Sequence, residues 1–248
     1  MIAEKNFERH LKIVVPYRDR EEHLRDFLPH LLDYMDCREI SYHIVIAEQE
    51  KGLPFNRGAM KNIGFLQGGP SDYTCFHDVD YLPLNADYSW TDNPACLALV
   101  GAEGRPINVE GSTRRIQLKS ASFFGGAVLM ADALFRQVDG YSNDYWGWGF
   151  EDTDLARRFD TAGVSCIRRP GVFCPLSHES YGHDADGVMN ADAALNRLVY
   201  MRKWRAGRLD EADGLSTLAY KILSQETLAA PINGSGMCQQ IKVRLFRA

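Results

Sequence analysis

The sequence predicts an α/β fold in which a mostly parallel sheet is flanked by helices. In the first half of the chain, short apolar runs alternate with segments of helical periodicity, the pattern of strand–helix–strand units. The 248 residues are enough to bury a core, and 45% of them are apolar and 25% charged, as in ordinary soluble domains. We find no internal repeat and no linker, and therefore expect a single domain over residues 1–248.

The first expected strand is the apolar run at residues 11–15, which Pro16 ends. A helix follows, with Asp19 as the predicted N-cap and Glu22 three residues later, as in a capping box. Apolar residues then recur at helical spacing and predict the buried face of that helix: Leu24, Phe27, Leu28, Leu31, Leu32 and Met35.

The alternation continues with a strand at 43–47, a helix at 57–67 that a Gly-Gly-Pro sequence ends, and a strand at 73–76. Strands joined through helices run parallel. The three strands therefore predict the centre of a parallel sheet, with their carboxyl ends at one edge.

The second half of the chain gives weaker signals. Residues 83–118 contain scattered turn residues and no clear period. The remaining elements that we expect are a strand at 123–130, helices at 132–138, 151–162 and 190–204, a strand at 165–168, a polar loop at 170–186, and one or two closing strands within 215–245.

Composition excludes several classes of function. Lys and Arg number 28 and Asp and Glu 33, and the net charge of −5 provides no broad basic field for a nucleic-acid partner. No apolar run of about 18 residues exists, so we expect no transmembrane helix. The polar N-terminus, MIAEKNFERHLK, is unlike a signal peptide, and the expected location is cytoplasmic. Six spread cysteines without a CxxC pair predict free buried thiols rather than a zinc site. No pattern predicts an oligomeric state.

Two carboxylates follow the third expected strand. Asp78 and Asp80 flank Val79 just past its end, and alternation in an extended chain puts both acids on one side. Ligands of open α/β sheets bind beyond the carboxyl ends of the strands, and paired carboxylates suit Mg²⁺ or Mn²⁺ on a diphosphate. A solvated surface turn is the alternative interpretation, because D-x-D sequences are common.

Arginines follow the first strand and precede the second helix. Arg18 and Arg20 come after Pro16 at a helix start, and Phe55 and Arg57 repeat this arrangement. Guanidinium groups beside a helix N-terminus favour an anionic ligand. Surface arginines that cap loops are the alternative.

The segment YWGWGFEDTD at residues 145–154 combines aromatic residues, glycines and acids. Aromatic faces such as that of Trp148 stack on sugar rings, and the glycines permit close approach and hinge motion. Glu151 and Asp152 are the first of three acids at a helix start. Stabilisation of the helix dipole would explain one or two of these acids, but not the aromatic loop beside them.

Two histidines, His178 and His183, lie in the polar loop with acidic residues nearby. A histidine there would complete the metal site that begins at Asp80. Solvent-exposed histidines in a flexible loop are the alternative interpretation.

Together, these segments resemble the β-1,4-galactosyltransferase family of inverting, metal-dependent glycosyltransferases. Five segments carry the resemblance in the family's order and spacing: VPYRDR (15–20), FNRGAMKNIGF (55–65), HDVDYLPL (77–84), FFGGAVLM (123–130) and YWGWGFEDTD (145–154). HDVDYLPLN and GLSTLAYK (214–221) are most similar to the xylosylprotein galactosyltransferase branch. Animal members carry a membrane anchor and a stem; we see neither here, and therefore expect a soluble, bacterial type of relative.

The resemblance implies a GT-A glycosyltransferase fold with a Rossmann-like sheet. Residues from 1 to about 85 would form the nucleotide-binding half, and the rest would form the acceptor-binding and metal-completing half. UDP-galactose and a sugar acceptor are the implied ligands, with Mn²⁺ rather than Mg²⁺ as cofactor. Asp80 is the implied metal ligand. The family's H-x-H or M-x-x-H pattern is replaced here by two histidines five residues apart, so His183 and then His178 are the further candidates.

The same resemblance implies roles at the site. Asp152 matches the general base, with Glu151 beside it, and Trp148 matches the tryptophan of a mobile loop. The implied nucleotide-sugar-binding residues are Pro16, Arg18, Arg20, Phe55, Arg57, Asp78, Val79, Trp148 and Gly149. The implied acceptor-binding residues are Phe123, Trp148, Glu151 and Asp152.

The expected reaction moves galactose to the 4-hydroxyl of a sugar acceptor, a β-xyloside. Phe123 matches a bulky aromatic residue near the donor's C2 substituent, which would exclude an N-acetyl group. Thr153 stands where the family has an acid, so the acceptor subsite is expected to differ. The alternatives are UDP-GalNAc or UDP-glucose as donor, a β-N-acetylglucosaminide as acceptor, and an inactive sugar-binding protein, which the intact Asp80 and Asp152 argue against.

Overall fold

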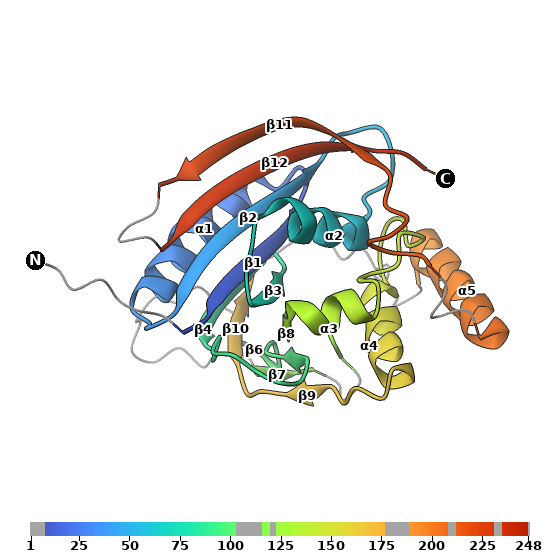
Figure 1. Ribbon diagram of the computed structural model, residues 1–248, viewed down its shortest axis with the longest axis horizontal. Coiled ribbons are helices and arrows are strands. Elements are labelled where there is room, and N and C mark those ends of the chain that lie inside the picture. Colours follow the sequence, from blue (N-terminus) through green and yellow to red (C-terminus); the bar gives the residue numbers. More distant parts are fainter. Residues whose placement is uncertain are drawn as a thin grey trace, which may run out of the picture.

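The computed structural model describes residues 8–102, 116–119, 123–176, 189–207, 212–230 and 235–247. Within these residues a large mixed sheet forms the centre of the molecule, with helices packed on both faces (Figure 1). Its strands are, in spatial order, β11 (Tyr220–Ala229), β12 (Met237–Leu245), β2 (Ser41–Gln49), β1 (His10–Tyr17), β3 (Tyr73–His77), β8 (Ala127–Ala131), β5 (Ala95–Cys96) and β9 (Ile167–Arg168).

A smaller sheet and the helices complete the described part. The smaller sheet has the order β4 (Tyr81–Asn85), β10 (Val172–Pro175), β6 (Val100–Ala102) and β7 (Ile116–Leu118). The helices are α1 (Glu21–Asp36), α2 (Arg57–Gln67), α3 (Asp132–Gln137), α4 (Glu151–Thr161) and α5 (Ala191–Ala206). None of the helices in the described residues is long and apolar enough to cross a membrane.

The centre of the large sheet is parallel. β12, β2, β1 and β3 run in one direction, and β1 pairs with β2 without irregularity from His10 opposite Ser41 to Tyr17 opposite Glu48. β11 and β8 pair antiparallel with their neighbours. The predicted α/β fold with a mostly parallel sheet is therefore confirmed, and the carboxyl ends of β1 and β3 meet at one edge.

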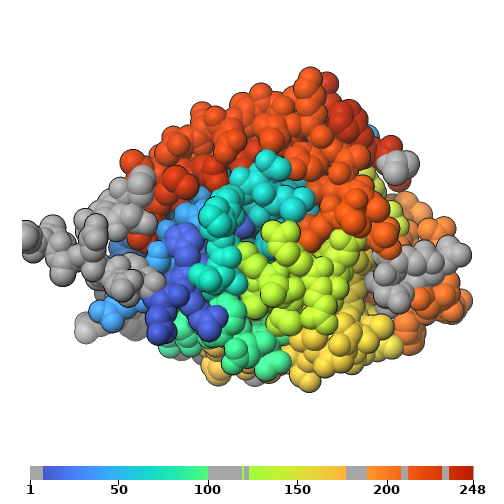
Figure 2. All heavy atoms as spheres, in the orientation of Figure 1, coloured from blue at the N-terminus to red at the C-terminus, as the bar shows by residue number. Residues whose placement is uncertain are grey.

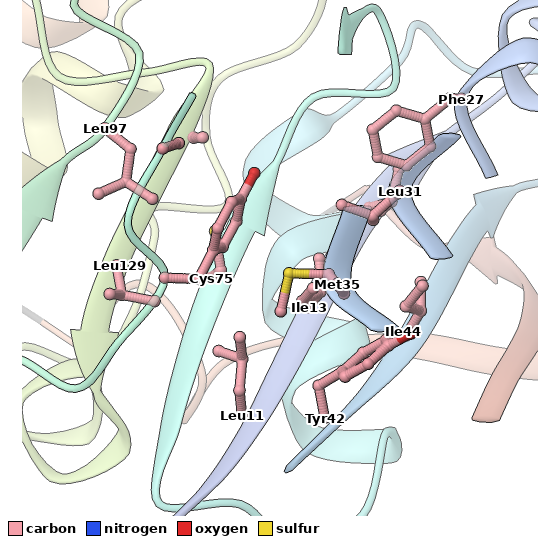
Figure 3. Close-up of a cluster of buried hydrophobic side chains, with 14 of the residues drawn as sticks. Leu11, Ile13, Phe27, Leu31, Met35, Tyr42, Ile44, Cys75, Leu97 and Leu129 are labelled. Atoms are coloured by element: carbon pink, nitrogen blue, oxygen red, sulfur yellow. The ribbon is translucent and has the colours of Figure 1, made fainter. Parts of the chain in front are cut away.

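Alternation along β1 distributes its side chains between two cores. Leu11 and Ile13 face α1, where Figure 3 shows them with Phe27 and Leu31, all fully buried. Val14 points to the opposite face, into the core that contains α2, α3 and α4. Each such side chain contributes roughly 1.5–3 kcal/mol on burial. In the space-filling view, the C-terminal strands in red cover the upper rim, next to α2 in cyan (Figure 2).

The predicted start of the first helix is wrong. Asp19 does not cap α1: it adopts a left-handed conformation with φ 51°, and its carboxylate pairs with Lys51 Nζ at 2.9 Å. The helix begins at Glu21 after Arg20, whose side chain makes no capping hydrogen bond. Asp tolerates the left-handed region, and here that conformation turns the chain sharply out of β1.

Two predictions in the second half are also corrected. The strand expected at 123–130 begins only at Ala127, because Gly126 has a φ of 73° that no strand accepts. The polar loop expected at 170–186 contains the strand β10. Residues 83–118, which show no clear period, contain β5, β6, β7 and most of β4. The two closing strands are confirmed as β11 and β12.

All six cysteines are free thiols, as predicted, but Cys37 and Cys166 are exposed. The prediction that every thiol is buried is therefore wrong. Cys37 follows the last turn of α1 and Cys166 precedes the edge strand β9, and both places lie at the surface.

Candidate active site

A pocket of about 360 Å³ lies at the carboxyl edge of the large sheet. It is built from the residues that follow β1 and β3, the start of α2, the aromatic–glycine loop and the start of α5. Its lining residues are Pro16, Arg18, Asp19, Arg20, Pro54, Phe55, Arg57, Asp78, Val79, Asp80, Gly147, Trp148, Asn190 and Asp192. Nine of these are residues that the sequence singled out for donor or metal binding.

The chain that leaves β1 holds two arginines at this pocket. Arg18 donates from Nη1 to the carbonyl of Leu53 at 2.7 Å, and its guanidinium lies 5.2 Å from the ring centre of Phe55. Arg20 lies within 3.1 Å of His23 on α1. The contacts orient both cations along one wall of the pocket, a fitting place for a phosphate group.

The start of α2 positions Arg57. Asn56 caps the helix by accepting a hydrogen bond from the Ala59 amide at 2.8 Å. Arg57 then reaches Glu151 at 3.0 Å and Asp78 at 3.9 Å. Burial by itself lowers the pKa of Arg57, because it disfavours the charged form. The charges of Glu151 and Asp78 outweigh this effect and raise the pKa of Arg57. Arg57 thereby joins the residues after β3 to the start of α4.

The two acids after β3 both line the pocket, with buried Val79 between them. The amide of Asp78 donates to the Gly126 carbonyl at 2.7 Å, which fixes the turn. Burial raises the pKa of Asp78, and the charge of Arg57 opposes that shift. The pair therefore presents hard oxygen donors to one cavity, as the alternation of the D-V-D sequence predicts.

Contacts on two sides fix the aromatic–glycine loop. The Gly147 amide donates to the Phe55 carbonyl at 2.7 Å, and a side chain at Gly147 would collide with Asp192 of α5. The buried amide group of Asn196 donates to the carbonyls of both Trp146 and Trp148 at 3.0 Å. Trp148 consequently forms part of the pocket wall.

The acids at the start of α4 divide into two functions. Asp154 is fully buried and holds the fold: it pairs with Arg158 at 2.5 Å and accepts from the Tyr145 hydroxyl at 2.8 Å. Glu151 and Asp152 face α2, where Glu151 binds Arg57 and Asp152 binds Lys61 Nζ at 2.9 Å.

Asp152 also lies against the residues that precede β8. A methyl group added at Gly125 would stand 2.5 Å from Oδ2 of Asp152 and 3.4 Å from Cε2 of Phe123. Gly125 therefore separates the predicted base from the predicted acceptor-side aromatic residue, without a side chain between them. Arg168 holds Phe123 through a hydrogen bond of 2.9 Å to its carbonyl.

The described residues include two candidate metal ligands. The carboxylates of Asp78 and Asp80 fit a hard divalent cation that takes its other ligands from a diphosphate, as Mn²⁺ and Mg²⁺ do. No cluster of three or more His, Cys, Asp or Glu residues occurs in the part of the chain that the structure describes. His178 and His183 lie outside the described residues, as does the rest of the segment 177–188.

Sequence reasoning did not assign several residues to this site, among them Asn190, Asp192, Lys61 and Gly125. Asn190 and Asp192 line the pocket, Lys61 binds Asp152, and Gly125 lies beside it. Asn190 was detectable as the N-cap of α5, where it accepts from the Ala193 amide at 2.8 Å. Gly149, which the sequence assigned to donor binding, belongs to the loop but does not line the pocket.

The fold and the pocket define the class of protein as a glycosyltransferase with a GT-A-like fold. The catalytic domain of Drosophila β-1,4-galactosyltransferase 7 in complex with xylobiose has a similar structure. It superposes with a TM-score of 0.72 at 25% identity, covering 96% of this chain and 95% of that one. A mutant of the Drosophila enzyme in complex with manganese, UDP-Gal and xylobiose matches equally well at 24% identity.

Sequence comparison identifies the family. Residues 4–91 match the N-terminal region of glycosyl transferase group 7, and residues 105–180 match the N-terminal domain of galactosyltransferase. Human β-1,4-galactosyltransferase 7 is 29% identical over 238 residues, and human β-1,4-galactosyltransferase 4 is 32% identical over 223. The matches cover 95% and 86% of this chain, and 67% and 59% of the two relatives. The chain belongs to the β-1,4-galactosyltransferase family of glycosyltransferases.

Proposed function

We propose that the protein is an inverting, Mn²⁺-dependent galactosyltransferase that moves galactose from UDP-galactose to the 4-hydroxyl of a β-xyloside. The main support is the position of Arg57, which contacts Asp78 in the pocket and Glu151 at the start of α4, next to Asp152. The candidate nucleotide-sugar site and the candidate base are therefore neighbours, as a direct transfer between two bound sugars requires.

The charge and shape of the pocket fit a nucleotide-sugar donor. Arg18 and Arg20 offer two guanidinium groups to a diphosphate, and Phe55 offers an aromatic face at the same wall. Trp148 closes the pocket from the other side, where it would exclude water that hydrolyses the donor. UDP-galactose as the donor is supported by the Drosophila relative, whose mutant was solved with UDP-Gal and manganese.

Asp80 is the proposed metal ligand, with Asp78 beside it near the donor sugar, and His183 and His178 are the further candidates. The bound Mn²⁺ would neutralise negative charge on the departing diphosphate. Buried Val79 and the hydrogen bond from the Asp78 amide hold the segment that carries the two carboxylates at the pocket.

Asp152 is the proposed general base. Inversion requires that the acceptor hydroxyl attacks the anomeric carbon on the face opposite the leaving UDP, while a carboxylate accepts the hydroxyl proton. Asp152 is about one-fifth exposed, so one side of it is reachable by an acceptor. Glu151, nearly buried and bound to Arg57, would orient the site rather than exchange the proton.

The acceptor is proposed to be a β-xyloside. Xylose has neither a C6 hydroxymethyl nor an N-acetyl group, so a small site suffices, and Phe123 lies next to the base across Gly125. The Drosophila relative, solved with xylobiose, supports a xylose-type acceptor.

An activity screen tests the proposal. Purified protein with Mn²⁺ is offered UDP-galactose, UDP-GalNAc or UDP-glucose against aryl β-xyloside and aryl β-N-acetylglucosaminide, with Asp152→Asn as the inactive control. We expect a β-1,4-galactosyl xyloside as the main product, and roughly 10²–10⁴-fold slower turnover in Asp152→Asn. Faster transfer to the glucosaminide would overturn the acceptor assignment, and absence of transfer from every donor would overturn the proposed activity.

A further inference from the structure

Lys61 is a buried cation that the proposed function has not used. Its side chain is 1% exposed, although Lys is among the residues least often buried. It lies on α2 one turn after Arg57, so both cations point to the same side of the helix, towards the start of α4. There Nζ lies 2.9 Å from Oδ1 of Asp152, the proposed base.

The surroundings of Lys61 are closed and mostly negative. Its ammonium lies 4.6 Å from the ring centre of Tyr141, a fully buried residue. The titratable and charged groups that act on it come from three elements: Asp152 and Glu151 from α4, Asp78 at the end of β3 and Cys75 within it, and Arg57 on its own helix. Burial by itself lowers the pKa of Lys61, but the charge of Asp152 outweighs burial and raises it, so the side chain stays cationic.

Tyr141 is a second polar group beside Asp152. Its hydroxyl makes no hydrogen bond of good geometry among the described residues. Burial, and then the nearby charge of Asp152, raise its pKa well above the ordinary value, so it stays protonated. Lys61 is the charged hydrogen-bond donor to Asp152, and the protonated Tyr141 hydroxyl is a neutral group beside the same carboxylate.

The two oxygens of Asp152 have different environments. Oδ1 faces Lys61, while Oδ2 lies next to Gly125, 2.5 Å from the point where a side chain on that residue would begin. The ion pair therefore selects one rotamer of Asp152 and presents a defined oxygen towards Phe123 and the acceptor side.

We propose that Lys61 is a positioning residue for transfer, which orients Asp152 through a charged hydrogen bond to Oδ1 so that Oδ2 takes the acceptor proton. The inference rests on the proposed function, because it assumes that Asp152 is the base. In the step that it serves, the acceptor O–H proton passes to Oδ2 as the oxygen bonds to the anomeric carbon. UDP leaves with the electron pair of the bond that breaks.

Removal of the charge should change the pH dependence of transfer. A carboxylate without its neighbouring cation is protonated more easily, typically by one to three pH units. In Lys61→Met, we expect the acid limb of the kcat profile to move to higher pH by about one unit or more. We also expect kcat near neutrality to fall roughly 10–100-fold, with the KM for UDP-galactose unchanged within about twofold, because Lys61 does not line the donor pocket.

A matched control uses the other fully buried lysine of the described residues. Lys12, near the amino end of the central strand β1, donates to the Phe65 carbonyl at 2.8 Å, so Lys12→Met removes a buried ammonium away from the carboxyl-end site. Its pH profile should coincide with the wild-type profile. An acid limb that moves equally in both variants, or in neither, would overturn the proposal.

Two further variants keep the test decisive. Lys61→Gln preserves a polar side chain without charge, and should shift the acid limb as Lys61→Met does, even if the latter folds poorly. The double variant Lys61→Met/Asp152→Asn should be no slower than Asp152→Asn alone, because the lysine would act only through the base. If the fold losses in kcat of the two single variants instead multiply in the double variant, Lys61 acts independently of Asp152 and the inference is refuted. Wild-type inactivity would instead refute the proposed function, so the two failures are distinguishable.

Discussion

Substitution of Gly125 by Ala should slow transfer far more than it weakens the fold. The added methyl would stand 2.5 Å from Oδ2 and 3.3 Å from Cγ of Asp152. Because a Cβ atom keeps at least 3.0 Å from such neighbours, the carboxylate or the backbone must move by about 0.5 Å. Asp152 cannot rotate freely away, since Lys61 holds its other oxygen at 2.9 Å.

The magnitude follows from that displacement. A misplacement of about 1 Å at a reacting group costs roughly 10²-fold in rate, so we expect kcat to fall about 10–100-fold in Gly125→Ala. Overpacking typically costs about 1–3 kcal/mol of stability, which leaves the protein folded. UDP affinity with Mn²⁺, measured by calorimetry, should be unchanged because Gly125 does not line the donor pocket.

A control separates geometry at the base from overpacking in general. In Gly64→Ala, the methyl would collide with the Val14 side chain in the core, away from Asp152. We expect this variant to lower the melting temperature and to leave kcat of the folded protein near the wild-type value. Wild-type kcat in Gly125→Ala would show that the close contact between Gly125 and Asp152 has no part in transfer.

Three other perturbations have defined outcomes. Asp80→Ala removes a proposed metal ligand, so UDP affinity should lose its dependence on Mn²⁺ in calorimetry; a retained dependence would exclude Asp80 as a ligand. Phe123→Leu should raise the rate of transfer from UDP-GalNAc relative to the rate from UDP-galactose. Equal use of both donors by the wild-type protein would contradict the proposed exclusion of the N-acetyl group by Phe123. Burial lowers the pKa of His43 to about 4 from its ordinary 6.5. Between pH 6.5 and 4, His43 therefore binds a proton in the unfolded chain but not in the folded state. The free energy of unfolding falls over this range as pH falls, by at most about 3 kcal/mol. Urea unfolding at pH 7.5 and 5 should show a smaller pH dependence in His43→Gln than in the wild-type protein, and equal dependences would refute this contribution.

Most elements in the first half of the fold were predictable because apolar runs, helical periodicity and capping residues mark them in the sequence. The apolar run at residues 11–15 predicts β1, and Asn56 begins α2 as a true N-cap, but the expected end of the strand at Pro16 is wrong, because β1 continues to Tyr17. The left-handed conformation of Asp19 was not predictable, because its ion pair with Lys51 comes from a loop after the next strand. The strands β5 and β9 have two residues each, too few for any period, and their pairing depends on segments more than 70 residues apart.

The pocket was predictable in outline because topology alone brings strand ends together. Alternation in the D-V-D sequence and the order of β1 and β3 place Asp78, Asp80 and the arginines at one edge. Lys61 was not predictable in the same way. A lysine in a helix is ordinarily solvated, and only the fold reveals that its partner, Asp152, lies 91 residues further along the chain.

The balance of charge around α2 connects the two halves of the proposed reaction. Arg57 and Lys61 are the two cations of this helix face, and four carboxylates surround them: Asp78, Asp80, Glu151 and Asp152. The cluster thus has two negative charges in excess, the charge that one divalent cation would neutralise. The same helix face contacts the acids after β3 and the acids of α4, so a metal at the proposed ligand Asp80 would lower the repulsion on Asp152. Binding of the proposed metal and donor would then be linked electrostatically to the proposed base through Arg57 and Lys61.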